Sequence, residues 1–398
     1  MAFFLQKEEQ KRLGIYIHIP FCRSKCQYCD FYSLSGGKDR RLVDDYLQAL
    51  ADHLREAGRL APNHLVDTIY FGGGTPSFFG AENLSRILDE IHRSFRLAPE
   101  VEITLEANPD SIDRKSLKKL IRAGFNRISI GVQSDDDAML KKLGRPHTFQ
   151  QAKTAMQQAR RAGFANISLD LMYGLPNQTT AQWEQTLERI IALRPEHISC
   201  YALKVEEGTP LWDYREAAGL PDDDTQAEMY LAACERLRAV GYEHYEISNF
   251  CKNGFASKHN MKYWNGGEYL GFGPTAASDF GGKRYTIVRD LHGYIDGIAK
   301  KQQVLSECES IAPRERAGEY VMLRLRTRDG IFAEEYERQY LMPFAPLDRI
   351  LKKFAEKGLA EKKNEGWSLT ENGWLLSNSI IVALQEAQER STPLAKKR

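Results

Sequence analysis

Hydrophobic residues in the first half of the chain fall into short apolar runs separated by longer amphipathic stretches. Residues 40–58 show the helical pattern, since apolar side chains recur every four positions from Leu42 to Leu54. The apolar runs are nearly continuous, as in parallel strands that are covered on both faces. They predict six strands, with helices between them, over residues 14–20, 66–74, 101–109, 127–134, 166–176 and 197–205.

Strands that alternate with helices indicate parallel pairing through right-handed crossover connections. Six units are fewer than the eight of a closed TIM barrel. We therefore predict an α/β fold, with a partial, TIM-like (β/α)6 barrel over residues 1–210.

The alternation stops near residue 210. Residues 242–250 have the pattern of a strand, and the stretch that follows is rich in Gly, Tyr and Trp, which is typical of a binding loop. Helical patterns return from about residue 311, followed by a hairpin over 358–370. The sequence predicts a connecting, ligand-binding region over 211–310 and a C-terminal α+β, winged-helix-like domain over 311–398.

Composition and charge narrow the choice of partners. The 398 residues suffice for two or three domains, and the hydrophobic content of 42% argues against global disorder. A net charge of +1 argues against nucleic acid as a partner, including DNA at the C-terminal domain.

The start of the chain lacks the apolar run of a signal peptide, and the sequence has no run of about 18 apolar residues that would predict a membrane span. We expect a cytoplasmic protein with no integral membrane segment.

Three of the seven cysteines lie within eight positions, at Cys22, Cys26 and Cys29, and Phe31 follows. In a cytosolic chain this crowding indicates metal or catalytic chemistry rather than a disulfide framework. A structural zinc site normally has four protein ligands, and no His or Cys follows closely to supply the fourth. Three thiolates can instead hold a 4Fe–4S cluster with one iron open. The other cysteines are expected to be small buried residues: Cys200, Cys234, Cys251 and Cys308.

Polar residues or glycines stand at the carboxyl end of every predicted strand. In barrels of this type, that end carries the functional site. The sequence therefore predicts one constellation of side chains, made of Cys22, Gly72 to Thr75, Glu106, Gln133, Asp170 and Tyr201.

The spacing C-x3-C-x2-C, with an aromatic residue before the third cysteine, resembles that of the radical SAM superfamily. The stretches "GIYIHIPFC", "FGGGTPS", "LEANP", "GVQS", "LGRPH" and "LDLMYGLP" are similar to those of one subfamily, which contains the oxygen-independent coproporphyrinogen III oxidases and the HemW haem chaperones. The resemblance covers residues 13–385, and its C-terminal part implies a helical cap over the barrel mouth.

This resemblance implies a 4Fe–4S cluster on the three cysteines, with S-adenosylmethionine (SAM) chelating the open iron. Carboxylates suit the ribose hydroxyls and the ammonium group, and an arginine suits the methionine carboxylate. The other interpretation of the carboxylates is that they cap strand ends. The implied SAM-contacting residues are Tyr16, Gly73, Gly74, Thr75, Glu106, Gln133, Arg145 and Asp170.

Two functions are open within this subfamily. The oxidase pattern continues to a fourth cysteine, where this chain has Phe31, and it carries a longer N-terminal extension. The segment "HNMKYW" (259–264) resembles the H-N-x-x-Y-W segment associated with haem binding in the chaperones. The resemblance therefore implies a haem-binding protein that transfers haem to acceptor proteins. It favours this chaperone function over an enzymatic one. Two enzymes are the alternatives. One is the oxidase, which is a radical SAM decarboxylase, and the other is a radical SAM enzyme that opens or methylates haem.

His259 is the haem ligand that this segment implies, with Tyr263 and Trp264 as flat apolar surface for the porphyrin. Cys251 is a weaker axial candidate. A lone histidine is more often a structural residue than a ligand, so a structural role for His259 is the competing interpretation. His18 lies beside the cysteine loop, where it either supports the cluster ligands or is a hydrogen-bonded residue of the core.

Overall fold

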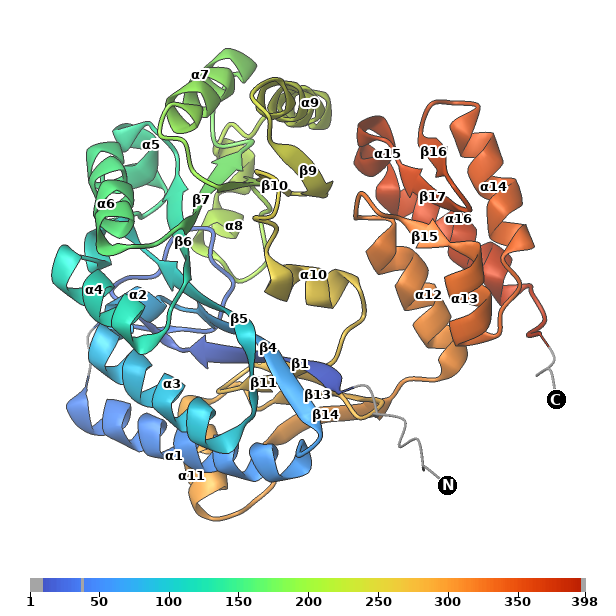
Figure 1. Cartoon of the computed structure of the whole chain (residues 1–398). Helices are drawn as coiled ribbons and strands as arrows, with labels where there is room; N and C mark the ends of the chain where they lie inside the picture. Colours follow the sequence, from blue (N-terminus) through green and yellow to red (C-terminus); the bar gives the residue numbers. More distant parts are fainter. Residues whose placement is uncertain (1–9, 37–38, 395–398) are drawn as a thin grey trace, which may run out of the picture.

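The computed structural model describes residues 10–36 and 39–394 (Figure 1). The first nine residues, on which much of the expectation of no signal peptide rests, lie outside this part of the chain. Within the described ranges, no helix combines the length and the apolar character needed to cross a membrane.

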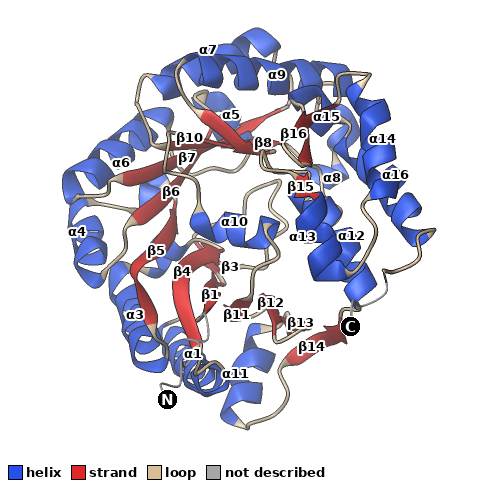
Figure 2. Cartoon of the chain, turned by 45° about the vertical axis from the view of Figure 1, so that its right-hand side comes forward, coloured by secondary structure: helices blue, strands red, loops and turns tan. Residues whose placement is uncertain are grey.

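Six parallel strands form the centre of a 12-stranded sheet and follow one another in chain order. They are β1 (Lys11–Ile19), β4 (His64–Gly73), β5 (Leu97–Ala107), β6 (Arg127–Gln133), β7 (Asn166–Tyr173) and β8 (His197–Ala202). Helices cover the outer face of the curved sheet (Figure 2): α1 (Arg40–Leu60), α3 (Ala81–Ser94), α4 (Arg114–Ala123), α6 (Phe149–Ala162) and α7 (Thr180–Ile191). The prediction of a partial barrel is confirmed.

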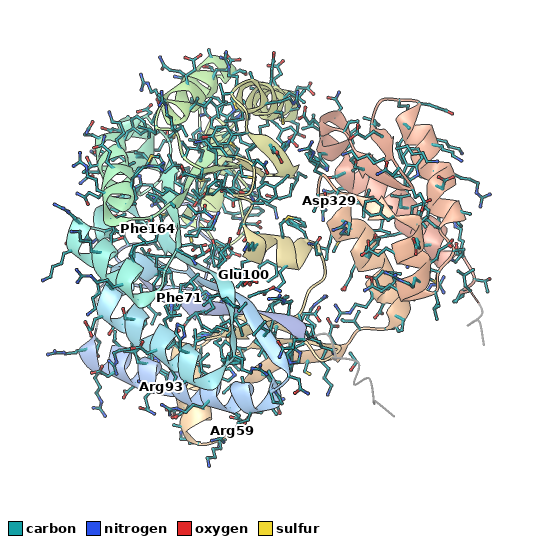
Figure 3. All side chains as sticks on the ribbon, in the orientation of Figure 1. Arg59, Phe71, Arg93, Glu100, Phe164 and Asp329 are labelled. Carbon is teal, nitrogen blue, oxygen red and sulfur yellow. The ribbon has the colours of Figure 1, made fainter. Side chains whose placement is uncertain are left out.

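Alternate residues of each strand face opposite sides of the sheet. Apolar side chains fill the layer between the strands and the outer helices, where Phe71 and Phe164 lie, whereas Arg59 and Arg93 are exposed on the helices (Figure 3). The inner face of the sheet is polar, since Glu106, Ser129, Asp170 and other residues line a cavity there. The barrel therefore has an apolar outer layer and a polar interior.

Residues 243–310 extend the same sheet at both edges. Beyond β8 lie β10 (Asn249–Cys251) and β9 (Glu243–Glu246), so the segment expected to form one strand is a hairpin of two. Beside β1 lie β11 (Tyr269–Phe272), β12 (Ala277–Phe280), β13 (Lys283–Ile287) and β14 (Leu305–Ser310). The region expected to connect two domains thus contributes six strands to the barrel sheet. The same region also contains the helices α9 (Asp223–Ala239) and α11 (Leu291–Ala299).

Three of the four scattered cysteines are buried, as expected, but Cys308 is exposed. It lies on β14, the last strand of the sheet, where residues 306–310 are all exposed. The expectation of a buried residue was wrong there because an edge strand has a neighbour on one side only.

A small C-terminal domain combines helices with a three-stranded sheet in the order β15–β17–β16. The expected hairpin is present as β16 (Ala360–Lys363) and β17 (Gly366–Leu369), and β15 (Ile331–Phe332) pairs with β17. The helices are α12 (Pro313–Arg324), α13 (Ala333–Tyr340), α14 (Ala345–Ala355), α15 (Glu371–Leu375) and α16 (Ser377–Glu389). The pattern over 371–389 predicts one closing helix, whereas the structure has two there, α15 and α16.

The C-terminal domain contacts the sheet near both of its edges. Next to β9, the Ile247 N–H donates to the Arg326 carbonyl at 2.9 Å, and the Arg328 N–H donates to the Tyr245 carbonyl at 2.9 Å. These backbone bonds fix the start of the domain against the β9–β10 hairpin.

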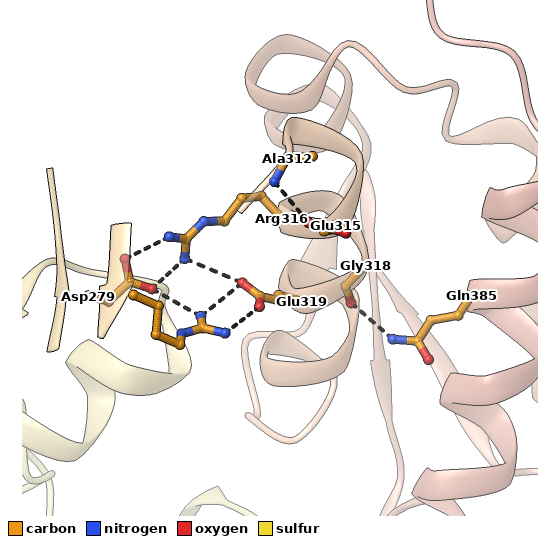
Figure 4. A network of polar contacts seen from close by, with 8 residues as sticks. Asp279, Ala312, Glu315, Arg316, Gly318, Glu319 and Gln385 are labelled. Atoms are coloured by element: carbon orange, nitrogen blue, oxygen red, sulfur yellow. Dashed lines mark hydrogen bonds and ion pairs between the residues drawn. The ribbon is translucent and has the colours of Figure 1, made fainter. Parts of the chain in front are cut away.

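A network of charged side chains makes the second contact, between β12, β13 and α12 (Figure 4). Arg284 donates to Glu319 at 2.6 Å and to Asp279 at 3.0 Å, and Arg316 donates to Asp279 at 2.7 Å. Each carboxylate is shared by two guanidinium groups, which makes the network stronger than isolated surface pairs. The domain is thus held at both ends of the open sheet.

Candidate cluster and cofactor site

The cysteine loop follows β1 directly and opens onto one cavity. Cys22 lies in β2 (Phe21–Cys22), and all three cysteines line a cavity of about 580 Å³ inside the barrel. Burial, together with the neighbouring charges of Cys26 and Cys22, raises the pKa of the Cys29 thiol. The three thiols are therefore close enough to repel one another as thiolates, which a bound metal cluster would relieve.

The glycine-rich turn after β4 holds this loop through its backbone. The Gly74 N–H donates to the Ile19 carbonyl at 2.8 Å, and the Thr75 N–H donates to the Phe21 carbonyl at 2.9 Å. A Cβ atom on Gly74 would lie 2.8 Å from both carbonyl oxygens, so only glycine permits this approach. The Thr75 hydroxyl lies 3.2 Å from the Cys22 sulfur. The turn therefore positions the first cysteine as well as lining the cavity.

His18 supports the same turn from within the core. Its Nε2 lies 2.9 Å from the Tyr32 carbonyl and its Nδ1 lies 3.3 Å from the Tyr16 hydroxyl. Burial lowers the pKa of His18 to about 4, so the ring is neutral. A Cβ atom on Gly73, where φ is +101°, would lie 2.7 Å from this ring. His18 is thus a buried structural residue that packs against the glycine turn.

Arg145 lies beside the cysteines. Its Nη2 donates to the Asn108 side-chain oxygen at 2.6 Å and to the Gly131 carbonyl at 2.9 Å, and its Nη1 lies 3.5 Å from the Cys26 sulfur. Its Nε is buried and has no hydrogen-bond partner among the described residues. The guanidinium therefore places positive charge next to the cysteine loop.

Two partly buried carboxyl groups face the same cavity. The Tyr70 hydroxyl donates to Glu106 at 2.7 Å, and burial raises the pKa of Glu106 to about 7. Burial also raises the pKa of Asp170. Three serine hydroxyls donate to Asp170 at 2.8 to 3.1 Å, and they belong to Ser129, Ser168 and Ser199. Such carboxyl groups, held by hydroxyl donors inside a cavity, are suited to bind hydroxyl or ammonium groups of a ligand.

Arg127 is a cavity residue that the sequence analysis did not identify. Its side chain is 2% exposed, it lines the cavity, and its Nε has no hydrogen-bond partner within the described ranges. An arginine at the start of an apolar strand resembles a flanking surface residue. One feature of the sequence could have indicated its position. Residues two apart on a strand face the same side, and Ser129, Gly131 and Gln133, which follow Arg127 at steps of two, line the cavity.

The helix α10 (Lys258–Trp264), which carries the "HNMKYW" segment, lies inside the ring of strands (Figure 2). Its Lys262 pairs with Asp67 at 2.9 Å, and its first N–H groups donate to Glu102 at 3.1 Å. These partners belong to the first half of β4 and the middle of β5, whereas the cysteines follow the carboxyl end of β1. The helix therefore closes the barrel at the end away from the cysteine loop.

His259 is 1% exposed in this arrangement. Its Nδ1 lies 2.9 Å from the Thr68 hydroxyl, its Nε2 lies 2.8 Å from the Tyr263 hydroxyl, and its ring stacks on Tyr70. Burial lowers the pKa of His259 to about 3, so the imidazole is neutral. Haem ligation by His259 stays a prediction, and both ring nitrogens already have partners. Cys251 is also buried, and burial raises its pKa to about 12.

Most of the predicted constellation surrounds one space. The cavity is lined by the three cysteines, Tyr201 and seven of the eight residues predicted to contact SAM: Gly73, Gly74, Thr75, Glu106, Gln133, Arg145 and Asp170. Tyr16 does not line it but stacks on Tyr70, which does. His259 lies outside the lining, although its neighbour Asn260 is part of it.

Comparisons with known proteins identify the family. The model of the radical SAM superfamily matches residues 16–190, and that of the HemN C-terminal domain matches residues 311–376. The chain is 38% identical to "Heme chaperone HemW" of Bacillus subtilis, over 92% of this chain and 98% of the relative. It is 35% identical to the Escherichia coli protein of the same name, over 93% and 97%. The chain belongs to the HemW family of radical SAM proteins.

The fold of this HemW-family chain also matches a solved structure. The radical SAM coproporphyrinogen III oxidase (HemN) of Escherichia coli aligns with a TM-score of 0.83, over 94% of this chain and 90% of the oxidase. The sequence identity is 24%, so this match supports a shared fold and carries no conclusion about activity.

Proposed function

We propose that the protein is a haem chaperone that binds haem and transfers it to acceptor proteins, on a radical SAM scaffold. The observation that carries the proposal is sequence similarity along more than nine-tenths of the chain to relatives named as haem chaperones. The residues of the cavity support the cofactors that this scaffold requires.

Cys22, Cys26 and Cys29 would hold a 4Fe–4S cluster. The donor set fits, because three free thiols from one short loop face a single cavity. Phe31, which is 66% exposed, stands where a fourth cysteine would follow. When bound, such a cluster supplies one-electron chemistry. Arg145 would offset part of the thiolate charge beside Cys26.

SAM would occupy the rest of the cavity. The positive charge of the Arg145 guanidinium can attract the methionine carboxylate, and Asp170 and Glu106 can accept from ribose hydroxyl or ammonium groups. Glu106, with its pKa near 7, can also hold a proton while the cavity is empty of a cationic ligand. These residues would orient SAM toward the cysteine loop.

Haem would bind at α10, with His259 as a ligand through Nε2. The tautomer with its proton on Nδ1 donates to the Thr68 hydroxyl, which would orient the ring as partners of metal-bound histidines do. Nε2 then carries no proton and can accept, and it accepts from the Tyr263 hydroxyl at 2.8 Å. Haem binding would therefore require Tyr263 to move away, so the described state is closed to the ligand.

The transfer step can be tested with haem-loaded, cluster-reconstituted protein and the apo form of a b-type haem protein from the same cell. The rate of transfer is followed by absorbance at increasing acceptor concentration. A chaperone that hands haem over in a complex gives a rate that rises with acceptor concentration. A rate that stays constant means passive release into solution and contradicts the proposal.

The oxidase alternative needs a separate assay. The same protein is incubated anaerobically with SAM, a reductant and coproporphyrinogen III, with the Cys26→Ala variant as the matched control. The chaperone proposal predicts that both samples leave the tetrapyrrole unchanged in mass spectrometry. Loss of two carboxyl groups with the parent protein alone would identify an oxidase instead.

A further inference from the structure

Three side chains with metal-binding atoms converge where the C-terminal domain meets the barrel. Cys234 comes from α9, His244 from β9 and Glu371 from the first position of α15. The Cys234 sulfur lies 3.6 Å from His244 Nδ1, and that nitrogen lies 3.7 Å from Glu371 Oε1. All three atoms lie within 4.8 Å of one another, and none of these residues lines the cofactor cavity.

These separations match those of a tetrahedral zinc site. Zinc binds Cys sulfur at about 2.3 Å, His nitrogen at about 2.0 to 2.1 Å and carboxylate oxygen at about 2.0 to 2.2 Å. With tetrahedral angles, such bonds place sulfur and nitrogen about 3.6 Å apart and nitrogen and oxygen about 3.4 Å apart. The observed 3.6 and 3.7 Å therefore need to change by only a few tenths of an ångström, and the sulfur and oxygen atoms, which lie within 4.8 Å of each other, would have to approach to about 3.6 Å to enclose an ion.

The imidazole of His244 is oriented for this role. Its Nε2 lies 3.3 Å from the Ile247 carbonyl, which can only accept, so the proton sits on Nε2 and the lone pair of Nδ1 faces Cys234 and Glu371. Metal-binding histidines typically donate their other N–H to a carbonyl in this way. The ring is stacked on Phe250 at 4.0 Å and packs edge-on to Trp374 at 4.5 Å, which fixes its direction.

The surrounding charges allow a cation. Glu371 forms an ion pair with Arg238, so its carboxylate is charged and can take part in binding a cation. The Cys234 thiol would lose its proton on binding the metal. Arg238, which is exposed, would then turn toward solvent or the second carboxylate oxygen.

We propose that Cys234, His244 and Glu371 form a binding site for a zinc-class divalent metal ion, with the fourth position open to water. Because Cys234 and His244 belong to the barrel and Glu371 to the C-terminal domain, the ion would link the two. The site is independent of the proposed haem function and of the cluster.

The test uses the full chain with Cys22, Cys26 and Cys29 replaced by Ala, since those thiols bind metals themselves. Cobalt(II) is titrated anaerobically, because a thiolate ligand gives it a charge-transfer band, and zinc is then added in competition. We expect one cobalt per chain, a thiolate band, and its loss when zinc displaces the cobalt. Cys234→Ser should abolish the band, whereas Cys308→Ser, at the exposed cysteine, should keep it.

Glu371→Gln provides a second variant, which keeps the size of the side chain and removes its charge. We expect zinc affinity to fall by about tenfold or more, and the zinc-dependent rise of the unfolding midpoint to disappear at a fixed zinc concentration. The proposal is overturned if no thiolate band forms, if the band survives Cys234→Ser but not Cys308→Ser, or if zinc raises the midpoint equally with and without the Glu371 carboxylate.

Discussion

Replacing His259 by Ala tests whether this imidazole is a structural element of the barrel. The ring lies between Thr68, Tyr70 and Tyr263 in the closed end of the barrel, and it is 1% exposed. The substitution would remove both hydrogen bonds and leave a space that α10 cannot easily fill.

The magnitude follows from these contacts. The buried hydroxyl group of Thr68 and the partly buried one of Tyr263 would lose their partners, at about 1 kcal/mol each. The stacked contact with Tyr70 and the edge contact with Tyr263 contribute about 0.5 to 1.5 kcal/mol each. We expect the free energy of unfolding to fall by about 3 to 5 kcal/mol.

The measurement is urea unfolding of the apo-protein, followed by fluorescence and circular dichroism. His292→Ala is the matched control, because His292 is exposed on α11 and its removal should cost less than about 0.5 kcal/mol. If His259→Ala costs no more than His292→Ala, the imidazole does not stabilise the barrel, and the structural argument is refuted.

Three further predictions concern the cluster and the pH dependence of stability. Cys26→Ala should abolish the broad cluster absorbance after anaerobic reconstitution, since one of three iron ligands is gone; unchanged absorbance would show that the ligand assignment is wrong. Gly74→Ala should lower the iron and sulfide content although every cysteine remains, because its Cβ would lie 2.8 Å from two carbonyl oxygens that hold the cysteine loop; full content would contradict this role. His259, with its pKa lowered to about 3, stays neutral when folded but takes up a proton below about pH 6.5 when unfolded, so it favours folding above that pH and loses its contribution as the pH falls toward 3. Urea midpoints at pH 7 and pH 5 should therefore differ less in His259→Gln than in the parent protein, and an equal difference would refute the assignment.

The local parts of the fold could be predicted from the sequence. The six strands and their helices follow from hydrophobic periodicity, and the cysteine loop is a local motif whose position after β1 fixes its place at the barrel end. The glycine turn after β4 was also predictable, although its backbone contacts with the loop, through Gly74 and Thr75, were not.

Long-range pairing could not be read in the same way. The short strands over residues 243–310 join both edges of the sheet, and such pairing depends on partners far away in the sequence. Arg127 was missed because its burial comes from neighbours on other strands. His259 shows the same limit, since "HNMKYW" indicates a haem ligand, whereas the contacts with Thr68 and Tyr263 appear only in the folded chain.

The most direct test of the proposed function is an anaerobic haem titration of the reconstituted protein, followed by absorbance, with His259→Gln and Tyr263→Phe measured beside it. The proposal predicts saturable binding that weakens in His259→Gln, because the ligand is lost. It predicts tighter binding in Tyr263→Phe, because the hydroxyl that occupies Nε2 is gone while the ring remains. Absence of saturable binding in the parent protein would contradict the haem chaperone, and binding indifferent to both variants would place haem away from α10.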